Sequence, residues 1–170
     1  NFPIALHNAA AALSASSETP RLDAELLAAF ALGMTRSDML MQLRDLVEPP
    51  SFTGLLARRI AHEPVAYITG TQAFWDLELR VTPDVLIPRA DSETLIEAAQ
   101  SAFAGGLGPK HVLDLGTGSG ALLLAALSLF PLASGVGIDA SLDALNVASG
   151  NAAQLGFAAR AEMRYLSWLD

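Results

Sequence analysis

Three glycines separated by single residues follow an apolar run that contains one acid, Asp114, and this pattern could bind a cofactor. The apolar run is typical of a short buried strand. Gly116, Gly118 and Gly120 allow a tight turn and let a ligand approach the backbone closely. Residues 121–127 are strong helix formers. A strand, a glycine turn and a helix in this order place unpaired N–H groups and the positive end of a helix dipole beside the turn.

The spacing of the glycines separates the candidate ligands. Dehydrogenase loops read Gly-x-Gly-x-x-Gly, and phosphate-binding loops end in Gly-Lys-Ser/Thr. Here the loop reads Gly-Thr-Gly-Ser-Gly, with no lysine nearby. The order acid-x-Gly-x-Gly-x-Gly is similar to the first motif of class I S-adenosylmethionine-dependent methyltransferases. A tight turn that binds no ligand is the alternative. We interpret the loop, including Thr117 and Ser119, as a binding site for S-adenosylmethionine.

A second acid, Asp139, lies at the end of the next apolar segment, residues 136–138, about 20 residues beyond the glycines. In a doubly wound sheet a carboxylate at this position accepts hydrogen bonds from ribose hydroxyls. It could instead be the N-cap of the helix that begins at Leu142. Because Ser141 could cap that helix, the two roles are compatible. We predict that Asp139 binds the ribose.

The elements around these acids predict a parallel sheet. Helices are expected over residues 121–129 and 142–155, and a third strand over residues 163–166. Strands that alternate with helices form parallel sheets through right-handed crossovers. The first of these helices is apolar on all sides, so we expect protein to cover it on both sides. The fold class is α/β: a helical bundle, a β-hairpin linker and the first half of a Rossmann-like class I methyltransferase sheet.

Residues 1–69 predict the small helical domain at the N-terminus. Thr19 is placed to cap a helix that ends at Gly33. Arg58 and Arg59, on a later helix, are expected to face water. The buried stripe of the Thr19–Gly33 helix is predicted to consist of Leu22, Leu26 and Phe30, with Leu27 beside them.

Residues 70–90 predict the hairpin linker, because residues 77–81 alternate apolar and polar side chains and could pair with residues 72–75. Residues 85–89 are expected to form a third extended segment. Residues 91–170 predict a methyltransferase domain that ends after its third strand. The buried side of its first helix is predicted to consist of Leu95, Ile96, Ala99 and Phe103.

The composition restricts the classes of function. Apolar residues make up 52% of the 170 and charged residues 16%, so a substantial core is available. A net charge of −8 repels phosphate backbones and argues against direct nucleic-acid binding. The chain has no cysteine, and its three histidines lack the spacing of metal ligands, so no metal site is predicted. Without a membrane-length apolar run, no membrane partner and a cytoplasmic location are expected.

Three strings of residues resemble one protein family. They are Phe-Trp-x-Leu at 74–77, Leu-Ile-Pro-Arg-x-Asp-Ser-Glu at 86–93, and Val-Leu-Asp-Leu-Gly-Thr-Gly-Ser-Gly at 112–120. Together with residues 17–25, they are similar to the protein-glutamine N5-methyltransferases that modify peptide-chain release factors, the PrmC/HemK family. The resemblance implies S-adenosylmethionine as cofactor, release factors as partners and a glutamine side chain as the methyl acceptor.

The resemblance also implies roles for single residues. Pro88 and Arg89 are expected to lie near the substrate, and Trp168 to line the adenine pocket. Two residues depart from the family pattern: Ala90 replaces a usual proline, and Ser167 replaces an acid that commonly precedes the tryptophan.

The family's Asn-Pro-Pro-Tyr motif, which holds the glutamine amide, does not occur in the 170 residues. We therefore expect no catalytic residue in this chain and interpret it as a C-terminally truncated, inactive fragment. A chain truly ending at Asp170 would leave one edge of strand 112–115 unpaired. We expect such a chain to associate through that edge, or the helical domain to cover it.

Two other functions are compatible with the same residues. A nucleic-acid adenine methyltransferase shares the fold and a similar clamp, although the acidic composition and the helical N-terminal segment weigh against it. A non-catalytic module that binds S-adenosylmethionine is favoured only if Asp170 is the true end of the protein. A nicotinamide dehydrogenase agrees least with the glycine spacing.

Overall fold

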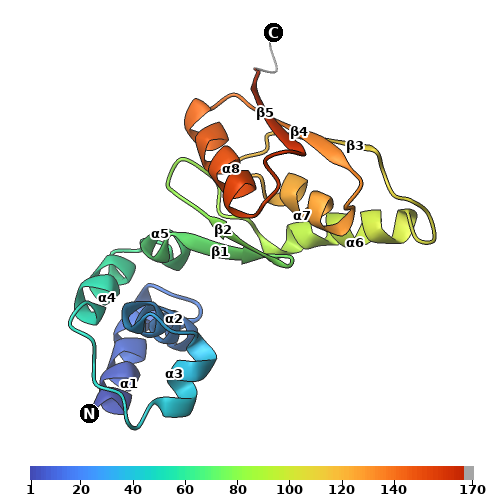
Figure 1. Ribbon diagram of the computed structural model, residues 1–170. Helices are drawn as coiled ribbons and strands as arrows, with labels where there is room; N and C mark the ends of the chain where they lie inside the picture. The colour runs from blue at the N-terminus through green and yellow to red at the C-terminus, as the bar shows by residue number, and fades with distance from the viewer. Residues whose placement is uncertain (167–170) are drawn as a thin grey trace. The chain divides into compact units, whose positions relative to one another are not determined.

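The computed structural model describes residues 1–166 (Figure 1). Its contacts divide the chain into two compact units, Asn1–Thr69 and a second unit that begins at Gly70. Ser167 and Trp168, including the predicted adenine contact, lie outside the described residues. Within the described part of the chain, no helix is both long and apolar enough to cross a membrane.

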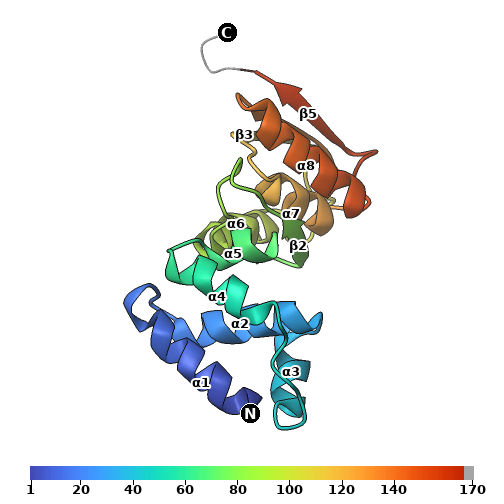
Figure 2. The same cartoon turned by 90° about the vertical axis from the view of Figure 1, so that its left-hand side faces the viewer.

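The first unit is helical, as predicted. Its helices are α1 (Phe2–Ala12), the 3-10 helix η1 (Leu13–Ala15), α2 (Pro20–Leu32), α3 (Arg36–Gln42), α4 (Phe52–Ile60) and α5 (Val65–Thr69). Helix α1 packs against α2 (Figure 2). Gly33 ends α2 in the left-handed conformation, with φ of 66°. Thr35 caps α3 by accepting the Asp38 N–H at 3.1 Å. The core of the unit includes Phe2, Leu13, Leu27, Met39 and Phe52.

The predicted buried face of α2 is wrong except at Leu27, which is buried. Leu22 and Phe30 are 40% and 47% exposed. The inner face instead carries two acids, Asp23 and Glu25, among the small or apolar residues Ala24, Leu27, Ala28 and Ala29. Arginines pair with both acids: Glu25 with Arg21 of the same helix and with Arg36 of α3, and Asp23 with a residue of α4. Arg59 does not face water but donates to Asp23 Oδ2 over 2.7 Å.

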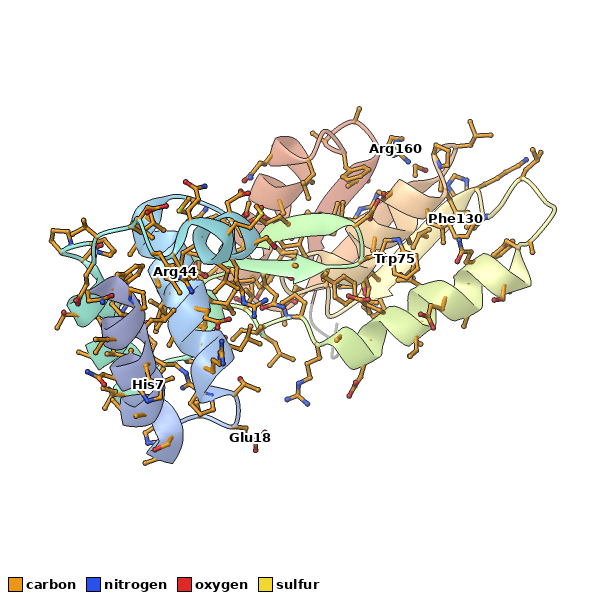
Figure 3. All side chains as sticks on the ribbon, turned by 90° about the horizontal axis from the view of Figure 1, so that it is seen from below. His7, Glu18, Arg44, Trp75, Phe130 and Arg160 are labelled. Carbon is orange, nitrogen blue, oxygen red and sulfur yellow. The ribbon has the colours of Figure 1, made fainter. Side chains whose placement is uncertain are left out.

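The second unit begins with the predicted hairpin. Strands β1 (Thr71–Phe74) and β2 (Leu77–Arg80) pair antiparallel. The turn between them includes Trp75, which has φ of 56° and is labelled in Figure 3. The chain then passes through residues 81–89, which pair with no strand; Arg89, at the end of the predicted extended segment, has an extended backbone. The 3-10 helix η2 (Ala90–Ser92) and α6 (Glu93–Ala102) follow. On α6 Ile96 is buried, but Leu95 and Phe103 are exposed, so that predicted face is only partly correct.

A three-stranded parallel sheet forms the rest of the unit, as predicted. Its strands β3 (His111–Leu115), β4 (Ser134–Asp139) and β5 (Ala161–Tyr165) lie in this order. Helices α7 (Ala121–Leu129) and α8 (Leu142–Gln154) make the crossovers. Every residue of α7 is buried or half-buried, which confirms the prediction from its apolar composition. The Arg160 guanidinium donates to the carbonyl of Leu127 in the last turn of α7 and to those of Phe130 and Ala133 just beyond it (Figure 3).

The face of the sheet opposite α7 is open among the described residues. Leu113 and Leu115 are 62% and 49% exposed, so β3 is half-buried rather than fully buried as predicted. The register places them beside Val136 and Ile138, which extends the apolar row across β4. Strand β3 is also at the edge of the described sheet. An exposed apolar edge strand is a template for pairing with another chain.

We predict that the 170-residue chain self-associates through this edge. Sedimentation at several concentrations should show oligomers, and the amides of residues 112–115 should exchange slowly. Leu113→Lys should shift the equilibrium towards monomer, because a lysine on an edge strand opposes pairing. Leu132→Lys, on an exposed leucine outside the strands, is the matched control. A monomer with fast exchange at β3 at every concentration would contradict the prediction.

Candidate functional site

The glycine loop joins β3 to α7. Gly116, Gly118 and Gly120 have φ of 78°, 54° and 83°, a backbone region that residues other than glycine rarely adopt. At Gly120 space is limiting as well, because a Cβ atom there would lie 3.2 Å from Leu124 Cδ1 and 3.4 Å from Ala148 Cβ. The spacing of the three glycines is therefore a requirement of this backbone path.

Four amides of the loop are already hydrogen bonded within the protein. Gly116 and Thr117 donate to the Ile138 carbonyl at 2.8 and 2.9 Å, and Gly120 donates to the Thr117 carbonyl at 2.7 Å. Gly118 donates to Asp139 Oδ2 at 2.9 Å. The prediction that N–H groups beside the turn are unpaired is therefore wrong for these four amides. A phosphate-binding loop leaves such groups free for its ligand, so this loop suits a ligand without phosphate.

Asp139 ends β4 and holds the loop. Its Oδ2 accepts the Gly118 N–H, and its Oδ1 accepts the Ser141 N–H at 3.0 Å. Ser141 caps α8 by accepting the Ala144 N–H at 3.2 Å, so Asp139 is not needed for that role. A carboxylate has about four acceptor positions. Two of those on Asp139 are used, and the remainder can accept hydroxyl groups of a ligand.

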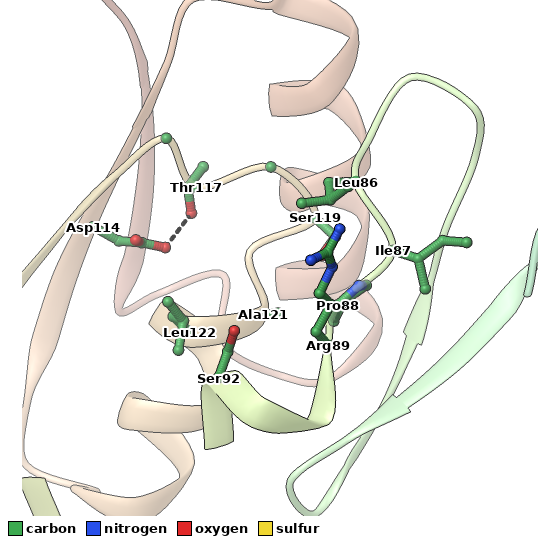
Figure 4. Close-up of a pocket in the computed structure, with 12 residues that line it drawn as sticks. Leu86, Ile87, Pro88, Arg89, Ser92, Asp114, Thr117, Ser119, Ala121 and Leu122 are labelled. Atoms are coloured by element: carbon green, nitrogen blue, oxygen red, sulfur yellow. Dashed lines mark hydrogen bonds between the residues drawn. The ribbon is translucent and has the colours of Figure 1, made fainter. Parts of the chain in front are cut away.

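Asp114 lies on the other side of the loop, beside Thr117. The Thr117 hydroxyl donates to Asp114 Oδ2 at 2.7 Å (Figure 4). Burial raises the pKa of the Asp114 carboxyl above its usual value; the hydrogen bonds from the Thr117 hydroxyl and the Leu123 backbone oppose this shift, and the charge of Asp139 adds to it. Gly137 of β4 makes room for this arrangement, because a Cβ atom there would lie 2.8 Å from Thr117 Oγ1. The site therefore contains an acid that is costly to ionise.

A cleft of about 140 Å³ brings the loop together with residues 86–89 (Figure 4). It is smaller than the roughly 300–1,000 Å³ of usual small-molecule sites, so it can accommodate only part of a cofactor-sized ligand. Pro88 and Arg89 thus line the same cleft as most of the predicted loop, whereas Gly120 and Asp139 lie outside its lining. The lining residues are Leu86, Ile87, Pro88, Arg89, Ser92, Asp114, Gly116, Thr117, Gly118, Ser119, Ala121 and Leu122.

Sequence reasoning missed Asn151, which lies on α8 and is 1% exposed. Its side chain contacts the backbone of both Arg80 and Ser119. The one signal in the sequence is a polar residue on the inner face of α8, next to the buried Ala152. That signal does not identify the partners, which are 71 and 32 residues away.

Two family models and solved structures match parts of this chain. Residues 5–70 match the PrmC N-terminal domain, and residues 109–170 match a methyltransferase domain. The solved structure of a ribosomal protein L11 methylase from Lactobacillus delbrueckii subsp. bulgaricus is 28% identical. It aligns over 54% of this chain and 45% of its own, with a TM-score of 0.43.

Curated relatives match most of this chain. The release factor glutamine methyltransferase of Aliivibrio fischeri is 40% identical over 91% of this chain and 54% of its own length. That of Bradyrhizobium diazoefficiens is 42% identical over 92% and 54%. That of Bordetella pertussis is 45% identical over 81% and 52%. The chain thus spans about half the length of the curated relatives it matches.

The parallel sheet and the glycine loop lie in the second unit, whose residues from 109 onwards match a methyltransferase domain. With a PrmC N-terminal domain preceding it, the chain is a homologue of the release factor glutamine methyltransferases. The predicted resemblance to the PrmC/HemK family is confirmed.

Proposed function

We propose that this chain is the cofactor-binding part of an S-adenosylmethionine-dependent enzyme that methylates a glutamine side chain of peptide-chain release factors. The relatives' names support the substrate and the reaction. The observation that carries the choice of cofactor is the glycine loop between two carboxylates, Asp114 and Asp139, with four amides bonded internally. Such a loop favours a ligand that is cationic and has no phosphate, as S-adenosylmethionine is.

The residues would divide the binding of this cofactor among them. Asp139 would accept hydrogen bonds from the ribose hydroxyls. The backbone of the loop Gly116–Gly120 would contact the cofactor directly, because its glycines carry no side chains. Trp168 remains a proposed adenine contact. When bound, the cofactor supplies an electrophilic methyl group on a sulfonium. The protein's own contribution is to orient that group and exclude water, which is the main source of catalysis where no covalent intermediate is needed.

Asp114 would attract the positively charged groups of the cofactor. Its carboxyl forms no ion pair among those found in residues 1–166, although burial makes its ionisation costly. A positive charge placed in the cleft would favour the ionised form and lower the pKa again. The cofactor's ammonium and sulfonium groups are such charges.

Binding of S-adenosylmethionine should therefore depend on pH. Because the pKa of Asp114 is raised in the free protein, affinity should increase as pH rises through that pKa and level off above it. Isothermal calorimetry between pH 4 and pH 8 measures this. Asp114→Asn should bind more weakly at high pH and lose this part of the dependence. Equal pH profiles for the two proteins would exclude Asp114 from binding, and no binding at any pH would reject the proposed cofactor.

The helical N-terminal domain is proposed to recognise the release factor, together with the hairpin linker at residues 70–90. In a full-length protein, deletion of residues 1–64 should impair methylation of an intact release factor more than methylation of a short glutamine peptide. Initial rates on the two substrates measure the difference. An equal loss on both would show that this domain serves stability, not recognition.

We propose that the residues that bind the substrate glutamine correspond to the part of the relatives' sequences that this chain does not match. An Asn-Pro-Pro-Tyr clamp supplied there would place the glutamine amide against the cleft wall that contains Pro88 and Arg89. We propose that the helical domain comprises residues 1–69, the hairpin residues 70–90 and the methyltransferase domain residues 91–170 of this sequence.

A further inference from the structure

Asn151 joins three segments that are far apart in the sequence. Its Oδ1 accepts the Arg80 N–H at 2.8 Å, and its Nδ2 donates to the Arg80 carbonyl at 3.0 Å. The same Nδ2 donates to the Ser119 carbonyl at 2.8 Å. The side-chain amide thus pairs with both backbone groups of Arg80, as a neighbouring strand would, and also holds the glycine loop.

These two partners lead to opposite walls of the cleft. Arg80 ends β2, and the chain continues from it to residues 86–89. Ser119 belongs to the glycine loop and lines the cleft itself. Asn151 itself does not line the cleft. It is therefore placed to set their separation without touching a ligand.

The other end of the hairpin is anchored to the same unit. The Trp75 N–H donates to Glu93 Oε1 at 2.9 Å. The Ser128 hydroxyl donates to Asp76 Oδ2 at 2.6 Å. With the turn held by α6 and α7 and the end of β2 held by α8, the hairpin is a fixed part of the second unit.

We propose that Asn151 is a positioning residue, which holds the cleft wall at residues 86–89 and the glycine loop at the separation that cofactor binding requires. This proposal rests on the proposed function. An asparagine is suited to the task because its amide donates and accepts at once. A carboxylate of the same shape could accept the Arg80 N–H but would face two carbonyl oxygens. Each buried polar group left unpaired carries an energetic cost.

Asn151→Asp tests the proposal, with Val147→Ala as the matched control. Val147 lies on the same helix and is 4% exposed, so its truncation weakens packing but removes no hydrogen bond to Arg80 or Ser119. Affinity for S-adenosylhomocysteine is measured by calorimetry at a temperature where thermal unfolding shows every variant fully folded. We expect about a tenfold loss for Asn151→Asp and less than about twofold for Val147→Ala.

Site-resolved hydrogen exchange provides a second readout that a purely structural role would not produce. In Asn151→Asp the amides of Arg80 and Gly118 should exchange faster than in Val147→Ala, once rates are compared at equal global stability. If Asn151→Asp does not fold, Asn151→Ser, which introduces no carboxylate, takes its place in both measurements.

Equal losses of affinity in the Asn151 and Val147 variants would overturn the proposal, as would an Asn151 variant that binds like the wild type. If the wild type itself binds no S-adenosylhomocysteine, the proposed function fails. Hydrogen exchange by itself then tests whether Asn151 is a positioning residue. Gly118 and Arg80 exchange rates that match those of the control would overturn it.

Discussion

Asp139→Ala is expected to lower the affinity for S-adenosylmethionine by roughly ten- to a hundredfold. The substitution removes the proposed acceptor of the ribose hydroxyls and also the acceptor of the Gly118 N–H, which holds the glycine loop at 2.9 Å. A hydrogen bond to a charged group contributes about 1.5–3 kcal/mol, and each 1.4 kcal/mol is about a factor of ten in affinity. Calorimetry with the purified chain measures the loss directly.

Two variants separate the contributions to this effect. Asp143→Ala removes the same charge from an exposed position in the first turn of α8 and should bind like the wild type. Asp139→Asn keeps one acceptor oxygen but loses the charge, so its affinity should lie between those of the wild type and Asp139→Ala. Unchanged affinity in Asp139→Ala would remove this residue from the site.

Arg59→Ala is expected to destabilise the helical unit by about 3 kcal/mol, a large part of the 5–15 kcal/mol that typically stabilises a domain. Asp23, which is 7% exposed, would lose its only charged partner among the ion pairs found in residues 1–166. The Ser17 and Thr19 hydroxyls still donate to it, at 2.7 and 3.2 Å. They place the effect at the lower end of the range for a broken buried pair.

Hydrogen exchange of the α2 amides under increasing urea measures this loss within the helical unit. Arg58→Ala is the matched control, because the neighbouring Arg58 pairs with Glu63 at an exposed position and should matter little. Adding Asp23→Asn to Arg59→Ala should restore part of the stability, since no buried charge is then left unpaired. Equal effects of the Arg58 and Arg59 substitutions would contradict a buried ion pair.

Local patterns in the sequence were sufficient for the elements of the sheet and for the loop between them. The three glycines identify the loop because each is required by its own positive φ, a property of single residues. The alternation in β2 and the composition of α7 likewise depend on near neighbours in the sequence. The parallel order of β3, β4 and β5 follows from the alternation of strands with helices.

The burial of charged and polar groups was not accessible to such patterns. Helical periodicity places the apolar Leu22 and Phe30 inside, yet both are exposed while Asp23 is buried. The partner that makes this burial possible, Arg59, is 36 residues away. The same holds for the half-exposed face of β3, where exposure depends on which elements cover the sheet and not on the strand's own residues.

The sequence by itself determined the class of domain, the position of the glycine loop and the two acids beside it, because these follow from local backbone preferences and residue types. Only the tertiary structure decided what the acids do. It showed that Asp139 holds Gly118, that burial raises the pKa of Asp114, and that Asn151 joins the hairpin to the loop. The physical reason is that hydrogen bonds and desolvation depend on groups brought together by folding, over separations that no local pattern records.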